Sequence, residues 1–418
     1  MTKTKACAAV VVASAWFAAC SQSSGPPGGG NTSFDSGMAS FDSSGSSSGG
    51  SSGGSSGSSS GSGSSSGSVD SGGADSGITV LSDITLPGPP ATPGSFGVDT
   101  STGTAYVAID PWTFTDAGLR LDGVAVVDVA TGTVTTTIPI PGQIPLSLAV
   151  DSSTHKVYVA ALANGTGAVS VIVIDGTTNM LTGASIAVVG FAGDVYLTAD
   201  PSTHHVFGYD GLDHVHVYDG TADTLITTIT LTGYDTMLFG NTGGGLALDP
   251  ASHNLWVLGP SSDDAGVATN SMLTAINGTA NTAGAQTPYT GAPTFLADDT
   301  ASTGNVFVVT QNPQHVVLDG PVNFQAPAGY TVTSMVDWNS CNATRYWGFV
   351  VDASGNSSIL GFDASGMVLT TGTPALAVAD LAQVTEALLA GGFEILLMEG
   401  MVGGSPALLP TLKRIKHC

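Results

Sequence analysis

The chain has 418 residues, with 8 Lys and Arg residues against 32 Asp and Glu residues, and its formal net charge is −24. No Lys or Arg occurs between Lys156 and Arg345. A negative field of this strength repels phosphate backbones, so the composition excludes nucleic acid as a partner.

The first 19 residues are typical of an export signal. Two lysines precede an apolar run over 6–15, and Phe17-Ala-Ala-Cys20 follows. A basic start, a short apolar run and small residues before a cleavage site predict a secretory signal peptide. Phe17–Cys20 resembles a bacterial lipobox, which implies a lipid on Cys20, although Phe17 stands where Leu is usual. The alternative is ordinary cleavage after a small residue, with Cys20 unmodified.

Residues 21–77 are almost entirely Ser and Gly. Such a segment buries too little apolar surface to offset its ordering entropy, so we expect a disordered tether with a span of roughly 40 Å. By resemblance to lipoprotein sorting rules, Ser21 favours the outer membrane. We therefore predict a signal over 1–19, a lipidated Cys20 and tether over 20–77, and a folded domain over 78–418, anchored by lipid in a bacterial cell envelope.

A phrase returns about every 49 residues within the folded domain. Its copies are Leu148–Val159, Leu197–Phe207 and Leu246–Val257. Each copy is an apolar strand that ends in Asp, a short turn and a second strand. A variable loop, a third strand and a Thr-rich fourth strand follow. A fixed period of all-strand units predicts an all-β fold in which small sheets stack into a β-propeller.

The ends of the domain set the predicted number of blades. The segment 78–87 reads as a lone fourth strand, and three strands are expected over 375–380, 387–399 and 407–415. Together they would complete a seventh blade, so that the N-terminal strand and the C-terminal strands close the ring. We predict seven blades, with six as the alternative, and 384–389 could instead be helical. The marker residues are Asp99, Asp151, Asp200, Asp249, Asp298, Asp337 and Asp380.

The repeats resemble YVTN/YncE-like β-propellers of the surface-layer type. The likeness rests on Leu148–Val159, Val171–Asn179 and Val124–Val134, and it is good over 78–310 but poor over 311–418. It implies an exported protein without a known reaction, and it specifies the scaffold far more than the function.

Histidines occur in two patterns. His155, His204 and His253 recur at one turn of successive units, and we interpret them as turn residues that hydrogen-bond locally. The other pattern is a hairpin in which a tight turn over 210–213 would place His214 and His216 on one face and His205 opposite. Imidazoles at this spacing can bind zinc or copper, but a site needs three or four convergent ligands. We therefore predict no cofactor, with a divalent metal as the alternative.

Two long loops are the candidate binding face. The segment 110–122 carries Trp112, Phe114 and Arg120, and the segment 259–266 carries Asp263 and Asp264. Loops on a rigid scaffold are where binding residues concentrate. The alternative is that Trp112 folds back onto its own blade. The acidic pairs Asp263–Asp264 and Asp298–Asp299 could chelate calcium or act in glycoside cleavage, but Asp298 is already a repeat marker.

Cys341 and Cys418 could form a disulfide, which would stabilise the fold by about 4 kcal/mol; the sequence leaves open whether they pair. No serine-hydrolase, zinc-protease or phosphate-loop motif is present. We therefore predict a monomeric, noncatalytic envelope lipoprotein that binds or displays an envelope protein or glycan through its loops. The alternative is a metal-dependent hydrolase or a lactonase-like propeller enzyme.

Overall fold

The protein was analysed as a computed structural model. It describes residues 78–86, 96–109, 123–164, 166–187, 196–234, 245–249, 251–261, 270–298, 306–311, 315–318, 324, 326–338, 345–354, 357–363, 366–367, 376–378, 381–389, 392–399 and 411–417. All of these residues belong to one compact unit of the chain. Every regular element among them is a strand, and none is a helix that could cross a membrane. The predicted signal, Cys20 and tether lie outside the described residues.

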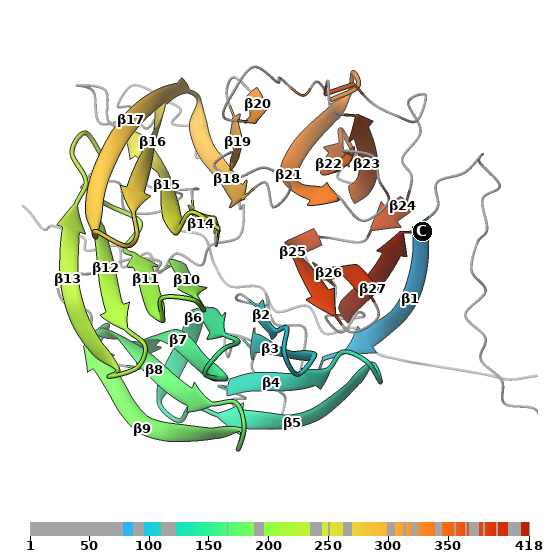
Figure 1. Cartoon of the computed structure of the whole chain (residues 1–418). Helices are drawn as coiled ribbons and strands as arrows, with labels where there is room; N and C mark the ends of the chain where they lie inside the picture. The colour runs from blue at the N-terminus through green and yellow to red at the C-terminus, as the bar shows by residue number, and fades with distance from the viewer. Residues whose placement is uncertain are drawn as a thin grey trace, which may run out of the picture. The chain divides into compact units, whose positions relative to one another are not determined.

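Five sheets are each built from four strands that are consecutive in the chain (Figure 1). The first is β2 (Phe96–Asp99), β3 (Thr104–Ile109), β4 (Gly123–Asp128) and β5 (Thr133–Pro139). The second is β6 (Gln143–Asp151), β7 (Lys156–Ala163), β8 (Val169–Asp175) and β9 (Met180–Ala187). The third is β10 (Tyr196–Asp200), β11 (His205–Tyr209), β12 (His214–Asp219) and β13 (Thr224–Thr230). The fourth is β14 (Gly245–Asp249), β15 (Asn254–Ser261), β16 (Asn270–Asn277) and β17 (Thr282–Thr290). The fifth is β21 (Tyr330–Trp338), β22 (Arg345–Asp352), β23 (Ser357–Asp363) and β24 (Leu376–Val378).

Two further sheets differ from this plan. One has three described strands, β18 (Ala292–Asp298), β19 (Val306–Gln311) and β20 (His315–Leu318). The other combines the two ends of the domain, in the order β1 (Ile78–Thr85), β27 (Thr411–His417), β26 (Gly392–Glu399) and β25 (Leu381–Leu389). β1 pairs antiparallel with β27, from Ile78 opposite His417 to Thr85 opposite Thr411.

The predicted number of blades, seven or alternatively six, is wrong. Within the described residues the propeller has five blades of four consecutive strands, and the two sheets above do not repeat that unit. The error arose after Asp298, where the 49-residue phrase ends and its period could no longer be extrapolated. The segment 375–380 was expected in the C-terminal blade. It contains β24, which instead pairs with β23 in the sheet formed by β21, β22, β23 and β24. The segment 384–389 is part of strand β25 and not helical.

The middle strands of each blade are buried because neighbouring sheets cover both of their faces. In β3, five of the six residues are buried, and β7 is buried over Val157–Ala161. One core cluster joins Tyr106 and Val126 of the first blade to Val157 and Val159 of the second. Consecutive apolar and β-branched residues therefore suit these strands on both sides.

The fourth strands are the exposed edges of the blades. β5 is mostly exposed and rich in Thr, and the pairing of β4 with β5 skips Thr135 at a register shift. Corresponding shifts interrupt β9, β13 and β17. Bulges of this kind twist an edge strand and hinder pairing with another chain.

Candidate functional site

The repeated turn after each marker Asp is organised by that carboxylate and by a left-handed residue. In the second blade Asp151 Oδ1 accepts hydrogen bonds from Ser153 N (2.9 Å) and Ser153 Oγ (2.5 Å). Four residues after the marker, the φ angles of His155, His204 and His253 are 56°, 59° and 58°. The first blade has Gly103 at this position, with φ 70°. A non-glycine residue here carries a steric cost, so a compensating contact is expected.

The compensating contact comes from the preceding blade. His155 Nδ1 lies 2.7 Å from Asp99 Oδ2, His204 Nδ1 lies 3.1 Å from Asp151 Oδ2, and His253 Nδ1 lies 2.8 Å from Asp200 Oδ2. The carboxylates are 2%, 0% and 1% exposed, whereas the imidazoles are 34%, 39% and 31% exposed. The histidines are turn residues as predicted, but their partners are not local.

A serine completes each of these contacts. Ser101 Oγ donates to Asp99 Oδ1 (2.5 Å) and lies 3.3 Å from His155 Nδ1. Ser153 and Ser202 repeat this arrangement in the next two turns. We call each Asp–Ser–His set an interblade latch. Three latches connect the first four blades in series.

The latch carboxylates are held in their charged form. Burial alone would raise the pKa of Asp99, Asp151 and Asp200, but hydrogen bonds from the serine, histidine and threonine side chains outweigh it and lower each pKa below its ordinary value. Their hydrogen bonds come from the residues of their own turn and from the histidine of the neighbouring blade. Each of the three histidines therefore connects its blade to the preceding one, and the three do not converge on one site.

A second polar contact reinforces one of these interfaces. Lys156 Nζ donates to Asp223 Oδ1 (2.8 Å) and to the Gly220 carbonyl (2.7 Å), and Tyr158 Oη donates to the same carbonyl (2.8 Å). Burial, with the nearby Asp223 carboxylate, raises the pKa of Tyr158 far above its usual range. Lys156, the last basic residue before Arg345, is thus used between the second and third blades.

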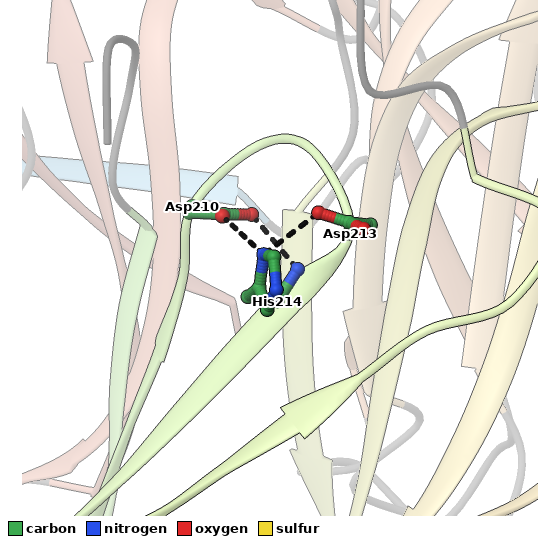
Figure 2. A group of neighbouring side chains, drawn as sticks. All are labelled: Asp210, Asp213 and His214. Carbon is green, nitrogen blue, oxygen red and sulfur yellow. Dashed lines mark hydrogen bonds and ion pairs between the residues drawn. The ribbon is translucent and has the colours of Figure 1, made fainter. Parts of the chain in front are cut away.

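A different Asp–His arrangement lies at the tight turn between β11 and β12. Asp210, Asp213 and His214 each offer a ligand atom, and these atoms all lie within 4.8 Å of one another. His214 Nδ1 is 3.2 Å from Asp210 Oδ2 and 2.7 Å from Asp213 Oδ1, and Figure 2 shows both carboxylates directed at this imidazole. We call these three residues the hairpin cluster.

The turn itself positions the cluster. Asp210 is 2% exposed, and its Oδ1 accepts from Leu212 N (2.9 Å) and His214 N (3.0 Å). Its second oxygen is thereby directed to the His214 side chain, which is 38% exposed. A carboxylate that caps its own turn in this way is fixed in orientation.

His216 lies next to the cluster on the same strand face. Its ring is parallel to that of His214, with ring centroids 6.4 Å apart. It is 2% exposed; its Nδ1 is 3.0 Å from Thr228 Oγ1, and its buried Nε2 has no hydrogen-bond partner among the described residues. Burial lowers the pKa of His216; the Asp210 carboxylate opposes that shift and His214 adds to it.

The hairpin is as the sequence predicts in three respects. The turn covers 210–213, and His214 and His216 share a face. His205 pairs with Asp219 across the strands and so lies on the opposite face, where its Nδ1 is 3.1 Å from the Gly278 carbonyl. The structure therefore does not bring His205 to the other two histidines. The side chains that lie at His214 are instead those of Asp210 and Asp213, which the sequence had indicated only as turn residues.

The other predicted site residues lie outside the described residues. These are Cys20, Trp112, Phe114, Arg120, Asp263, Asp264, Cys341 and Cys418. The lipidation, disulfide and loop-binding predictions therefore stay predictions.

The strand order of the described sheets defines the class of protein, a β-propeller. No protein-family profile and no curated protein sequence matches the chain, so the YVTN/YncE-like resemblance also stays a prediction. Among solved structures the chain is similar to "Kuenenia stuttgartiensis Hydrazine Synthase", with 11% identity and a TM-score of 0.42 over 75% of this chain and 78% of that one. A likeness this distant carries no argument about function.

Proposed function

We propose that this protein is a noncatalytic binding or display scaffold of a bacterial envelope, of the YVTN/YncE-like kind and anchored by a lipid on Cys20. Its binding surface would be the loop face, which we define as the connections between the second and third strands of the blades. The observation that carries the proposal is the use of the repeated Asp and His residues as interblade latches.

The repeated aspartates and histidines are of the residue types that a hydrolase uses, but here they are engaged in the interblade latches. General acid–base catalysis needs a carboxylate or imidazole that can exchange a proton with a bound substrate. Asp99, Asp151 and Asp200 are instead almost fully buried and accept hydrogen bonds from serines and histidines. The repeated chemistry thus favours a stiff ring over a reaction.

A stiff ring is a suitable support for variable loops. In the five blades the longest second-to-third connections follow Ile109 of β3 and Ser261 of β15. The strand order is the same in every blade, so these connections leave the sheets at the same end. They contain the predicted contact residues, Trp112, Phe114, Arg120, Asp263 and Asp264.

Co-sedimentation with isolated outer membranes and with peptidoglycan tests this proposal. The full-length chain would carry Cys20→Ser, so that a lipid makes no contribution to binding. We expect combined Trp112→Ala, Phe114→Ala and Arg120→Ala substitutions to weaken binding about tenfold or more. The matched control is Met180→Ala with Ile226→Ala, which removes exposed apolar side chains from the outer strands. Equal binding by all three proteins would contradict a loop-face scaffold.

The anchor is tested separately. Expression with a labelled fatty acid should label the wild-type chain but not the Cys20→Ser chain, and only the wild type should partition into detergent. Label on both proteins, or on neither, would contradict the proposed lipid anchor on Cys20. It would leave the proposal for the loop face unaffected.

The second candidate function is a metal-dependent hydrolase or lactonase-like enzyme, and the observation that favours it is the hairpin cluster. A panel of lactones and esters assayed with zinc, manganese or calcium would distinguish the two functions. Turnover that disappears in His214→Ala would favour the enzyme, and its absence under conditions of proven metal binding would favour the scaffold.

A further inference from the structure

We propose that Asp210, Asp213 and His214 form a binding site for a divalent transition metal such as zinc, with His216 as the fourth ligand. This inference is independent of the scaffold proposal, because a structural metal and a loop-face partner can each exist without the other.

The distances within the hairpin cluster suit a small metal ion. A tetrahedral ion with bonds of about 2.1 Å holds its ligand atoms about 3.4 Å apart. His214 Nδ1 is already 3.2 Å from Asp210 Oδ2 and 2.7 Å from Asp213 Oδ1. To admit the ion, the first of these distances would lengthen by about 0.2 Å and the second by about 0.7 Å. The Asp210 carboxylate is held in orientation by two backbone N–H groups, which donate to its other oxygen.

The charges of the cluster also favour a cation. Two carboxylates face one nitrogen, and His214 Nδ1 carries at most one proton to donate to them. A protonated imidazole would leave one negative charge uncompensated, whereas a divalent ion would balance both carboxylates. Among the described residues, the ion pairs of Asp210 and Asp213 are with His214 alone, and Lys156 pairs with Asp223 instead.

His216 is the independent observation that points to a ligand. It is almost fully buried beside His214, and in the part of the chain that the structure describes its Nε2 has no hydrogen-bond partner. When Nδ1 donates to Thr228 Oγ1, Nε2 presents a lone pair, which is the state of a metal-binding histidine whose second nitrogen is held by an oxygen. Two imidazoles on one tetrahedral ion would have ring centroids about 5 Å apart, against the observed 6.4 Å. His216 is not among the residues whose ligand atoms already lie within 4.8 Å of one another, so binding requires its ring to turn out of its parallel arrangement with His214 and toward the cluster.

The donor set indicates the kind of metal. Two imidazole nitrogens and two carboxylate oxygens match zinc and neighbouring transition metals, whereas calcium takes six to eight oxygens. The site should therefore distinguish zinc from calcium, which diffuse attraction to an acidic surface would not do.

Titration of the EDTA-treated full-length chain with zinc, followed by calorimetry, tests the site. Cobalt is the second probe, because its visible absorption reports tetrahedral coordination directly. The variants are Asp213→Asn, His214→Ala and His216→Phe; the last keeps a buried ring without its nitrogens. The controls are His205→Ala, on the opposite face of the same hairpin, and Asp175→Asn, which removes one carboxylate at a different turn.

We expect one zinc ion per chain, with affinity at least about tenfold weaker in Asp213→Asn and His214→Ala and unchanged in both controls. His216→Phe should lose the tetrahedral cobalt spectrum. Calcium should not compete at equal concentration. Thermal melting of each metal-free variant establishes that it is folded. The site is refuted if the wild type shows no saturable binding, or if the controls weaken binding as much as the cluster variants do.

Discussion

The chain brings aspartate and histidine together in two regions with different consequences. In an interblade latch, one buried carboxylate meets one imidazole from the next blade, and a serine shares the same carboxylate. In the hairpin cluster, two carboxylates from one turn meet one imidazole, which follows Asp210 by four positions and Asp213 by one, and the charges do not balance. The imidazoles are equally exposed, 39% for His204 and 38% for His214. The two regions use the same residue types. They differ in how many carboxylates meet the imidazole and in whether the partners come from two blades or from one turn.

Removing a latch carboxylate should have the largest effect. Asp151 is fully buried, orders its own turn and faces His204 of the next blade. Asp151→Ala leaves those donors without an acceptor, so we expect a loss of about 3 kcal/mol in the free energy of unfolding, measured with urea. The matched variant Asp175→Ala removes a turn carboxylate whose hydrogen-bond partner among the described residues is Thr177 of its own turn, and its loss should be clearly smaller. Equal losses would mean that the latch adds nothing beyond the turn.

Changing the latch histidine separates backbone strain from the hydrogen bond. His204→Ala loses the contact and keeps a left-handed backbone, so we expect a loss of about 2 kcal/mol. His204→Gly loses the same contact but relieves the strain, and it should cost about 1 kcal/mol. Gly103 occupies the equivalent position of the first blade and shows that glycine fits. Urea unfolding in which glycine is the worse replacement would contradict this explanation.

Acid should weaken the latches in a defined direction. The pKa of Asp151 is lowered in the folded chain because hydrogen bonds from Ser153 and His204 outweigh its burial. Its stabilising contribution is therefore fully present above the ordinary pKa near 3.8 and is lost as the pH falls through the lower folded value. The free energy of unfolding should fall below about pH 4, and by less in Asp151→Asn. A pH dependence that is the same in both proteins would exclude the latch as its source.

The smallest effect on stability is expected at the hairpin. His214 is a partly exposed side chain whose ion pairs are confined to one turn. Without metal, His214→Ala should change the free energy of unfolding by less than about 0.5 kcal/mol, again measured with urea. A loss as large as that of His204→Ala would show that the cluster is a structural contact of the same kind as a latch.

The sequence predicted the parts of the fold that depend on local pattern. The repeated phrase located the marker Asp, the turn and the second strand, as at Asp151 and β7. The pairing of the segment 78–85 with the chain end followed from the need to close a ring, and β1 pairs with β27. Alternation along β12 placed His214 and His216 on one face.

The parts that depend on contacts between units could not be predicted in the same way. His204 lies 53 positions after Asp151, and a repeat shows that turns are equivalent without showing that one turn contacts the next. The number of blades failed where the period ended after Asp298. Asp210 and Asp213 were not recognised as candidate ligands because aspartates are common in tight turns. The feature that distinguishes them is the order of the turn, in which two residues separate the aspartates and His214 follows directly.

The most direct test of the account is thermal melting of wild type, His204→Ala and His214→Ala, each with EDTA and with saturating zinc. We predict opposite responses: His204→Ala lowers the metal-free Tm and keeps the zinc-dependent increase, whereas His214→Ala keeps the metal-free Tm and loses that increase. If both variants change the same quantity, the two Asp–His arrangements have one role, and the distinction between latch and metal site is wrong.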